Sequence, residues 1–150
     1  MPIRCEIVSQ DRLVYEGDAD IILLPGIEGE MGILPNHAPL LSALKIGILR
    51  VRNKGVELNF TISGGVVEVQ PDLVTILADA AENVMEIDVA RAEAAKRRVE
   101  DMLAQGPGPD TDAYLRLEAA LRRSNLRLEA VRRFRGQRSP YGGSGQEGSA

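Results

Sequence analysis

The sequence of 150 residues predicts an α+β fold, in which an N-terminal antiparallel β-sandwich or flattened barrel of about ten short strands precedes a C-terminal antiparallel two-helix hairpin. Three observations support this prediction. Up to about residue 80, short β-type segments alternate with turn signals. From residue 87 onward, apolar residues recur at helical spacing. Residues 106–109, Gly-Pro-Gly-Pro, cannot continue a helix and must reverse the chain between two helical stretches.

The expected strands lie between breakers that are rich in Gly, Pro and Asn. Many short strands without intervening helices favour a sandwich or barrel over a parallel α/β sheet. The alternation of Val-Glu-Val-Gln at residues 67–70 predicts one buried and one solvated face. The expected strands cover residues 3–9, 13–16, 19–24, 32–34, 40–43, 47–52, 56–62, 66–70 and 73–78.

The helical stretches each carry one apolar stripe. Asp88 is expected to cap the first helix, because its carboxylate can accept hydrogen bonds from free backbone N–H groups one turn on. The second helix is expected to start near residues 110–112, where acidic side chains suit the helix dipole. An alanine-rich seam buries little apolar area, so the hairpin is expected to be a movable part. The stripes are Ala92, Ala95, Val99 and Met102, then Tyr114, Leu117, Leu121, Ser124, Leu128 and Val131.

These boundaries predict three segments: a sandwich at residues 1–86, a hairpin at 87–138 and a Gly- and Ser-rich disordered tail at 139–150. Charge divides along the same line. Residues 1–86 carry 6 basic and 13 acidic side chains, a net of −7, whereas residues 87–150 carry 12 and 9, a net of +3. This balance argues against a chain that binds nucleic acid along its whole length.

A single cysteine, Cys5, excludes an internal disulfide and fits a reducing compartment. Its alternating apolar context predicts a half-buried thiol. No apolar run approaches the roughly 20 residues of a membrane span, and the first residues lack the apolar core of a secretory signal. We therefore expect any membrane association to go through a partner.

Arginines flank both helical stripes. Arg91 and Arg98 are seven residues apart and share one face of the first helix, while Arg116, Arg123 and Arg127 fall within about 40° of one another on the second. Closing the hairpin would gather these like charges at one edge, and an anionic ligand would relieve their repulsion. The alternative is that they are ordinary solvated arginines on polar helices.

No enzymatic constellation stands out in the sequence. His37 is the single histidine, so a metal cluster or a histidine-based triad has few parts available. No G-x-x-x-x-G-K-[ST] phosphate loop is present, and Gly64-Gly65 is interpreted as a tight turn. The chemistry alone therefore indicates a binding or mechanical module.

Three segments resemble one family, the epsilon subunit of F-type ATP synthases. Residues 29–41, Gly-Glu-Met-Gly-Ile-Leu-Pro-Asn-His-Ala-Pro-Leu-Leu, are similar to its G-E-x-G-x-x-P-G-H-A-P-L-L signature. Residues 63–69 resemble S-G-G-x-x-E-V, and residues 87–92 resemble [I/L]-D-x-x-R-A. Asn36 stands where the family usually has glycine, and Asn also accepts a positive φ. The proline-rich connection is longer than usual, and the glycine-rich tail is extra.

The resemblance implies a non-catalytic rotor subunit that joins the gamma subunit to the ring of c subunits, at the cytoplasmic face of the bacterial inner membrane. It places rotor contacts on the sandwich, with Glu30 and His37 as the expected polar contact residues of the loop at 28–39. It further implies that the hairpin extends toward the catalytic alpha and beta subunits to inhibit ATP hydrolysis. No cofactor or metal is required.

In some bacterial members of the family the folded hairpin binds ATP, which implies a regulatory ligand here. The ATP-binding positions of those members match, in this sequence, Glu82, Ile87, Asp88, Arg91, Ala92, Arg98, Arg116, Arg123 and Arg127. These matching positions include all five arginines that the helical spacing selects.

Two other functions remain open on the sequence. One is a purely structural coupling subunit whose hairpin senses no nucleotide. The other is a helical-hairpin nucleic-acid binder fused to a sandwich, against which the acidic N-terminal half argues.

Overall fold

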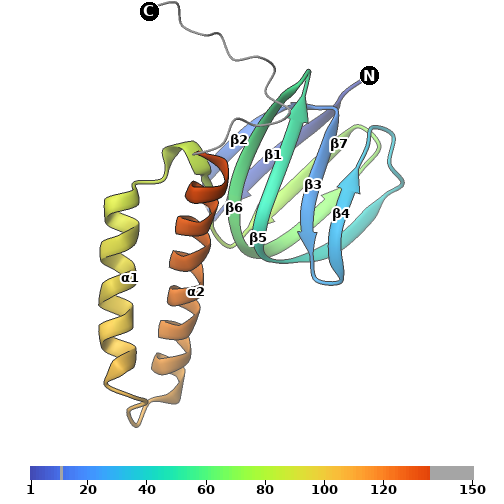
Figure 1. The fold of residues 1–150 in the computed structure, drawn as a ribbon. Helices are drawn as coiled ribbons and strands as arrows, with labels where there is room; N and C mark the ends of the chain where they lie inside the picture. Colours follow the sequence, from blue (N-terminus) through green and yellow to red (C-terminus); the bar gives the residue numbers. More distant parts are fainter. Residues whose placement is uncertain (11, 136–150) are drawn as a thin grey trace, which may run out of the picture.

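The computed structural model describes residues 1–10 and 12–135, as a β-sandwich with a helical hairpin beside it (Figure 1). The predicted fold class is confirmed, with eight strands in the described residues where about ten were expected. The elements are β1 (Ile3–Ser9), β2 (Arg12–Ala19), β3 (Ile21–Gly26), β4 (Gly29–Ile33), β5 (Leu40–Asn53), β6 (Val56–Val69), β7 (Leu73–Ala78), β8 (Ala81–Asn83), the 3-10 helix η1 (Val84–Glu86), α1 (Val89–Ala104) and α2 (Thr111–Phe134).

The strands follow the order β2-β1-β7-β6-β5-β3-β4, with β8 paired to β6. The two 14-residue strands β5 and β6 form the centre, and β7 and β3 extend the sheet on their two sides. The pairing of β1 with β7 is parallel, which departs from the antiparallel expectation. A parallel pair needs a long connection, and β2 to β6 supply it.

Two pairs of expected strands are each fused into one long strand. The segments 40–43 and 47–52 join in β5, and 56–62 and 66–70 join in β6. The expected tight turn at Gly64-Gly65 is therefore wrong. These glycines adopt φ of 110° and 139° inside β6, where they form a bend that the ladder tolerates.

The core of the sandwich consists of aliphatic side chains around one aromatic pair. Phe60 is buried, and its ring centroid lies 5.3 Å from that of Tyr15. Cys5 is fully buried in this core and not half-buried as expected. Burial raises the pKa of its thiol to about 12, so the group stays protonated and unreactive at neutral pH.

The helical hairpin forms as the sequence predicts at both caps. The Asp88 carboxylate accepts a hydrogen bond of 3.1 Å from the Arg91 N–H, and Asp110 caps α2 in the same way. The seam buries Ala92 and Ser124. Met102 is 51% exposed, so its assignment to the stripe is wrong. Leu103 is half-buried instead, because it lies about three full turns from Ala92.

Gly65 should be essential to the sandwich. A Cβ atom there would lie 2.2 Å from the Leu77 carbonyl oxygen, at a φ that L-residues avoid. Gly65→Ala is expected to lower the free energy of unfolding by about 2–5 kcal/mol, since strain and overpacking combine. Gly32→Ala is the matched control, because its Cβ would meet ordinary contacts at 3.5 Å. Urea denaturation of both variants checks this, and equal stability would contradict it.

Candidate functional site

The hairpin is joined to the sandwich by a second, small apolar cluster. Its buried members come from η1, the residue that follows it, and both helices. The floor of the cluster on the sandwich side is Ile48 of β5. Figure 1 shows α2 between α1 and the sheet, so α2 makes most of the contacts between the hairpin and the sandwich. The buried residues are Val84, Ile87, Ala92 and Ala130, with Ile48, Leu128, Val131 and Phe134 packed against them.

Two arginines of the hairpin add polar contacts to this cluster. Arg127 Nε lies 2.7 Å from Glu82 Oε1, and its Nη2 donates a hydrogen bond of 3.2 Å to Oε2. Arg135 Nη1 donates a hydrogen bond of 2.6 Å to the Ile87 carbonyl. The Arg127 and Glu82 side chains are 26% and 41% exposed, so solvent screens their attraction, and its contribution is at most about 1 kcal/mol.

All five predicted arginines lie on the same edge of the hairpin. The opposite edge holds a hollow of about 230 Å³, which Glu93 and Lys96 of α1 and Arg132 of α2 help to line. At 100° per residue, Arg91 and Arg98 project away from that hollow. Arg116, Arg123 and Arg127 project away from it on α2, and the last two line a cavity against the sandwich.

This arginine edge is assembled only in part. The cavity beside Glu82 and Arg127 measures about 40 Å³, which holds water but not a nucleotide. The other arginines are exposed, and the nearest carboxylate of Arg116 is that of Asp110 at 3.9 Å. In the described part of the chain, no ion pair within 4.0 Å involves Arg91, Arg98 or Arg123.

Three non-arginine members of the predicted set have structural contacts. Ile87 and Ala92 are 2% and 0% exposed in the cluster under the hairpin, so contact with a ligand would require their side chains to leave it. The Asp88 carboxylate accepts from the backbone of α1. Glu82, the remaining member, is the partner of Arg127.

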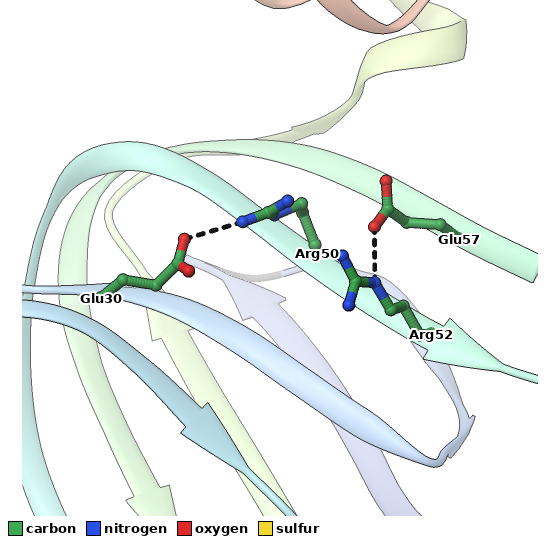
Figure 2. Close-up of polar contacts among 4 residues, drawn as sticks. All are labelled: Glu30, Arg50, Arg52 and Glu57. Atoms are coloured by element: carbon green, nitrogen blue, oxygen red, sulfur yellow. Dashed lines mark hydrogen bonds and ion pairs between the residues drawn. The ribbon is translucent and has the colours of Figure 1, made fainter. Parts of the chain in front are cut away.

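Glu30 lies in β4 near the β3–β4 turn, and His37 lies in the loop between β4 and β5, beside the β6–β7 turn. Glu30 pairs with Arg50 at 2.9 Å, next to an Arg52–Glu57 pair at 2.8 Å (Figure 2). Sequence reasoning missed these pairs, although alternation in β5 places both arginines on one face. The imidazole Nδ1 of His37 lies 2.7 Å from the Ala38 carbonyl oxygen, which accepts its hydrogen bond.

The loop around His37 confirms one detail of the sequence analysis. Asn36 adopts a φ of 62°, the left-handed conformation that asparagine tolerates better than most residues. Within the ranges 1–10 and 12–135, no cluster of His, Cys, Asp or Glu could hold a metal ion. Over the same ranges, no helix has the length and apolar content needed to cross a membrane.

Family comparisons account for nearly all of the described chain. Residues 2–84 match the family described as "ATP synthase, Delta/Epsilon chain, beta-sandwich domain", and residues 85–132 match "ATP synthase, Delta/Epsilon chain, long alpha-helix domain". This chain belongs to the ATP synthase delta/epsilon chain family. The two matches meet at residues 84 and 85, within η1, where the sandwich gives way to the hairpin.

Individual proteins of this family are similar to this chain along most of its length. It is 44% identical over 133 residues to the ATP synthase epsilon chain of Dehalococcoides mccartyi, covering 89% of this chain and 94% of that one. The identity to the Pelotomaculum thermopropionicum epsilon chain is 51% over 102 residues, or 68% and 76% of the two chains. A chain in a Euglena gracilis mitochondrial ATP synthase structure, of OSCP, F1 and c-ring, superposes with a TM-score of 0.68 at 29% identity, over 86% of this chain and 80% of that one.

Proposed function

We propose that this chain is the epsilon subunit of a bacterial ATP synthase, a non-catalytic rotor subunit that links gamma to the c ring. Family membership across both halves supports this assignment, as does the similarity to a chain of a c-ring-containing assembly. Its place is the cytoplasmic face of the inner membrane, where it is peripheral and held through the complex.

An apolar row across the outer face of the sheet carries the proposal. The pairing registers place Leu13 opposite Val8, Val8 opposite Leu77, Leu77 opposite Val66, and Val66 opposite Ala43. Five adjacent strands thus present one line of apolar side chains, in which Leu13 and Leu77 are 53% and 52% exposed. A continuous exposed apolar surface of this kind marks a protein interface, and we assign it to gamma.

The contact with the c ring is proposed for the loop region 28–39 at another part of the sandwich. Glu30 is fixed there by its pair with Arg50, so its carboxylate is presented from a rigid strand. Ile27 and Leu34, which flank it along the chain, are 61% and 56% exposed. His37 completes the proposed polar contact set.

The hairpin is the proposed regulatory part. Its docking cluster is small, and two of the four buried members are alanines, so little apolar area opposes its release. Once released and extended, its basic second helix would meet acidic segments of the alpha and beta subunits and inhibit ATP hydrolysis. A purely structural coupling subunit is the alternative function.

ATP is the proposed ligand of the folded hairpin. Of the arginine edge, Arg123 and Arg127 line a cavity against the sandwich. The pair of Arg127 with the Glu82 carboxylate supports the binding of an anion there. Phosphate groups fit exposed guanidiniums, whereas Glu82 and Asp88 suit hydrogen-bond donors of ribose or adenine. Because the present cavity is about 40 Å³, the hairpin must move outward to admit a nucleotide.

The rotor assignment is tested at Leu77. Leu77→Glu places a charge in the apolar row without disturbing the core, and should weaken co-assembly with gamma by about tenfold or more. Leu115→Glu is the matched control, because Leu115 is 54% exposed on α2, away from the sheet. Pull-down of full-length variants by purified gamma measures this. Undiminished binding by Leu77→Glu would remove the assigned interface.

The regulatory role is tested by truncation. Deleting residues 87–150 should raise ATP hydrolysis by the assembled enzyme and leave rotor assembly intact, because the sandwich core is self-contained. Deleting only residues 136–150 is the control and should change hydrolysis little. An unchanged rate after the larger deletion would favour the purely structural coupler.

Nucleotide binding is tested by thermal melting of the full-length chain. A ligand of the folded form stabilises it by about 2.7 kcal/mol at a hundredfold excess over Kd, so ATP should raise Tm. Arg91→Ala should remove most of the rise, and it leaves the Arg127–Glu82 pair in place. Arg97→Ala, also exposed on α1, is the control. If millimolar ATP leaves Tm unchanged, the nucleotide proposal fails and the rotor function stands.

A further inference from the structure

A second hollow lies between α2 and the sandwich, about one turn N-terminal to Arg127 along the helix. It measures about 350 Å³. Three of its lining side chains are cationic, and they come from both halves of the chain: Lys45 from β5, and Arg122 and Arg123 from α2. A single carboxylate, that of Asp79, also lines it, so the lining carries a net charge of +2.

The three cations of this hollow form no ion pair in the part of the chain that the structure describes: none of Lys45, Arg122 and Arg123 has a carboxylate within 4.0 Å there. Asp79 lines the same hollow and still lies beyond ion-pair distance of each of them. Like charges from two parts of the chain therefore face one hollow, with Asp79 offsetting only part of their charge, which opposes the docking of the hairpin.

The β5–β6 ladder is interrupted at Lys45. It pairs Leu44 with Gly65 and Ile46 with Ser63 in one unchanged register, and Lys45 and Gly64 between them form no ladder pair. Gly64 has a φ of 110°, and a Cβ atom there would lie 3.0 Å from Asp79 Oδ2. The glycine thus leaves room for the carboxylate at the rim of the hollow.

We propose that this hollow binds a phosphate group, which bridges Lys45 of the sandwich to Arg122 and Arg123 of the hairpin. A phosphate monoester carries about −1.5 to −2 charges at neutral pH, which matches the net charge of the lining. Arginine forks bind its oxygens in pairs, and the Ser63 hydroxyl, also in the lining, can donate to it. The bound anion fastens the folded hairpin to the sandwich.

This site does not depend on the proposed arginine edge for ATP. Arg123 is common to both, but Lys45, Asp79 and Arg122 are not part of that edge. Arg122 projects about 100° around the helix from Arg123. Substitutions at Lys45 and Arg122 therefore probe this hollow, and Arg91→Ala probes the other.

The test uses the full-length chain and inorganic phosphate, titrated at constant ionic strength with chloride as the balancing ion. Amide chemical shifts of Gly64 and Gly65 report on the hollow. We expect a saturable change, weakened about fivefold in Lys45→Ala and in Arg122→Ala, as for loss of one screened charge contact. Asp79→Asn should tighten binding, because it removes the opposing carboxylate. Arg97→Ala is the control and should bind phosphate as the natural sequence does.

A parallel titration with ATP identifies the source of the phosphate. If the group belongs to a nucleotide, ATP should bind at least about tenfold more tightly than phosphate and still lose affinity in Lys45→Ala. If free phosphate is the ligand, ATP should bind without this tenfold gain in affinity, as measured at the Gly64 and Gly65 amides. Either result supports the proposal that the hollow binds a phosphate group. The proposal is overturned if neither probe saturates these shifts, or if Arg97→Ala weakens binding as much as Lys45→Ala.

Discussion

The antiparallel pairing of β5 with β6 supports every other part of the molecule. Their ladder runs from Asn53↔Val56 to Leu40↔Val69. Its inward side chains, such as Leu49 and Phe60, form the core, and its outward side chains include the floor for α2. The same ladder contains the interruption at Lys45 and Gly64, and its strand β6 pairs with β8, which carries Glu82. The hairpin therefore docks on the sandwich, whose core is separate from it, and the sandwich also supplies Glu82 as the charged partner of Arg127.

The two halves are built to different strengths. The sandwich encloses a continuous aliphatic core, whereas the buried members of the docking cluster include two alanines, Ala92 and Ala130. Alanine burial contributes little apolar stabilisation at about 25 cal/mol per Å². Charge then becomes comparable with packing at the hairpin. The Arg127–Glu82 pair favours docking, whereas Lys45, Arg122 and Arg123, which form no ion pair among the described residues, oppose it. Anions can shift such a balance, but they cannot unfold the sandwich.

Local features of this fold could be predicted from sequence, and long-range ones could not. Residues 3–9 and 73–78 were assigned as β1 and β7 with the right bounds, and Asp88 as a cap, because alternation and capping are local. The parallel β1–β7 pair depends on topology, which no local pattern encodes. Helical spacing predicts the arginines on one edge. The contact of Arg127 with Glu82 joins distant segments and was not predicted, although the family resemblance placed both residues in one set. The hollow that Lys45, Arg122 and Arg123 line was missed because it forms between segments that are far apart in the sequence.

The parallel pair has a consequence for biosynthesis. β1 lies between β2 and β7, so the first strand of the sandwich to be synthesised pairs on one side with one of the last strands of the sandwich. The nascent chain can form the β1–β2 ladder early, but the core stays open until residue 78 has been made. The hairpin, whose helices contact each other locally, is synthesised after that closure. The order of synthesis therefore completes the docking surface before the part that docks on it exists.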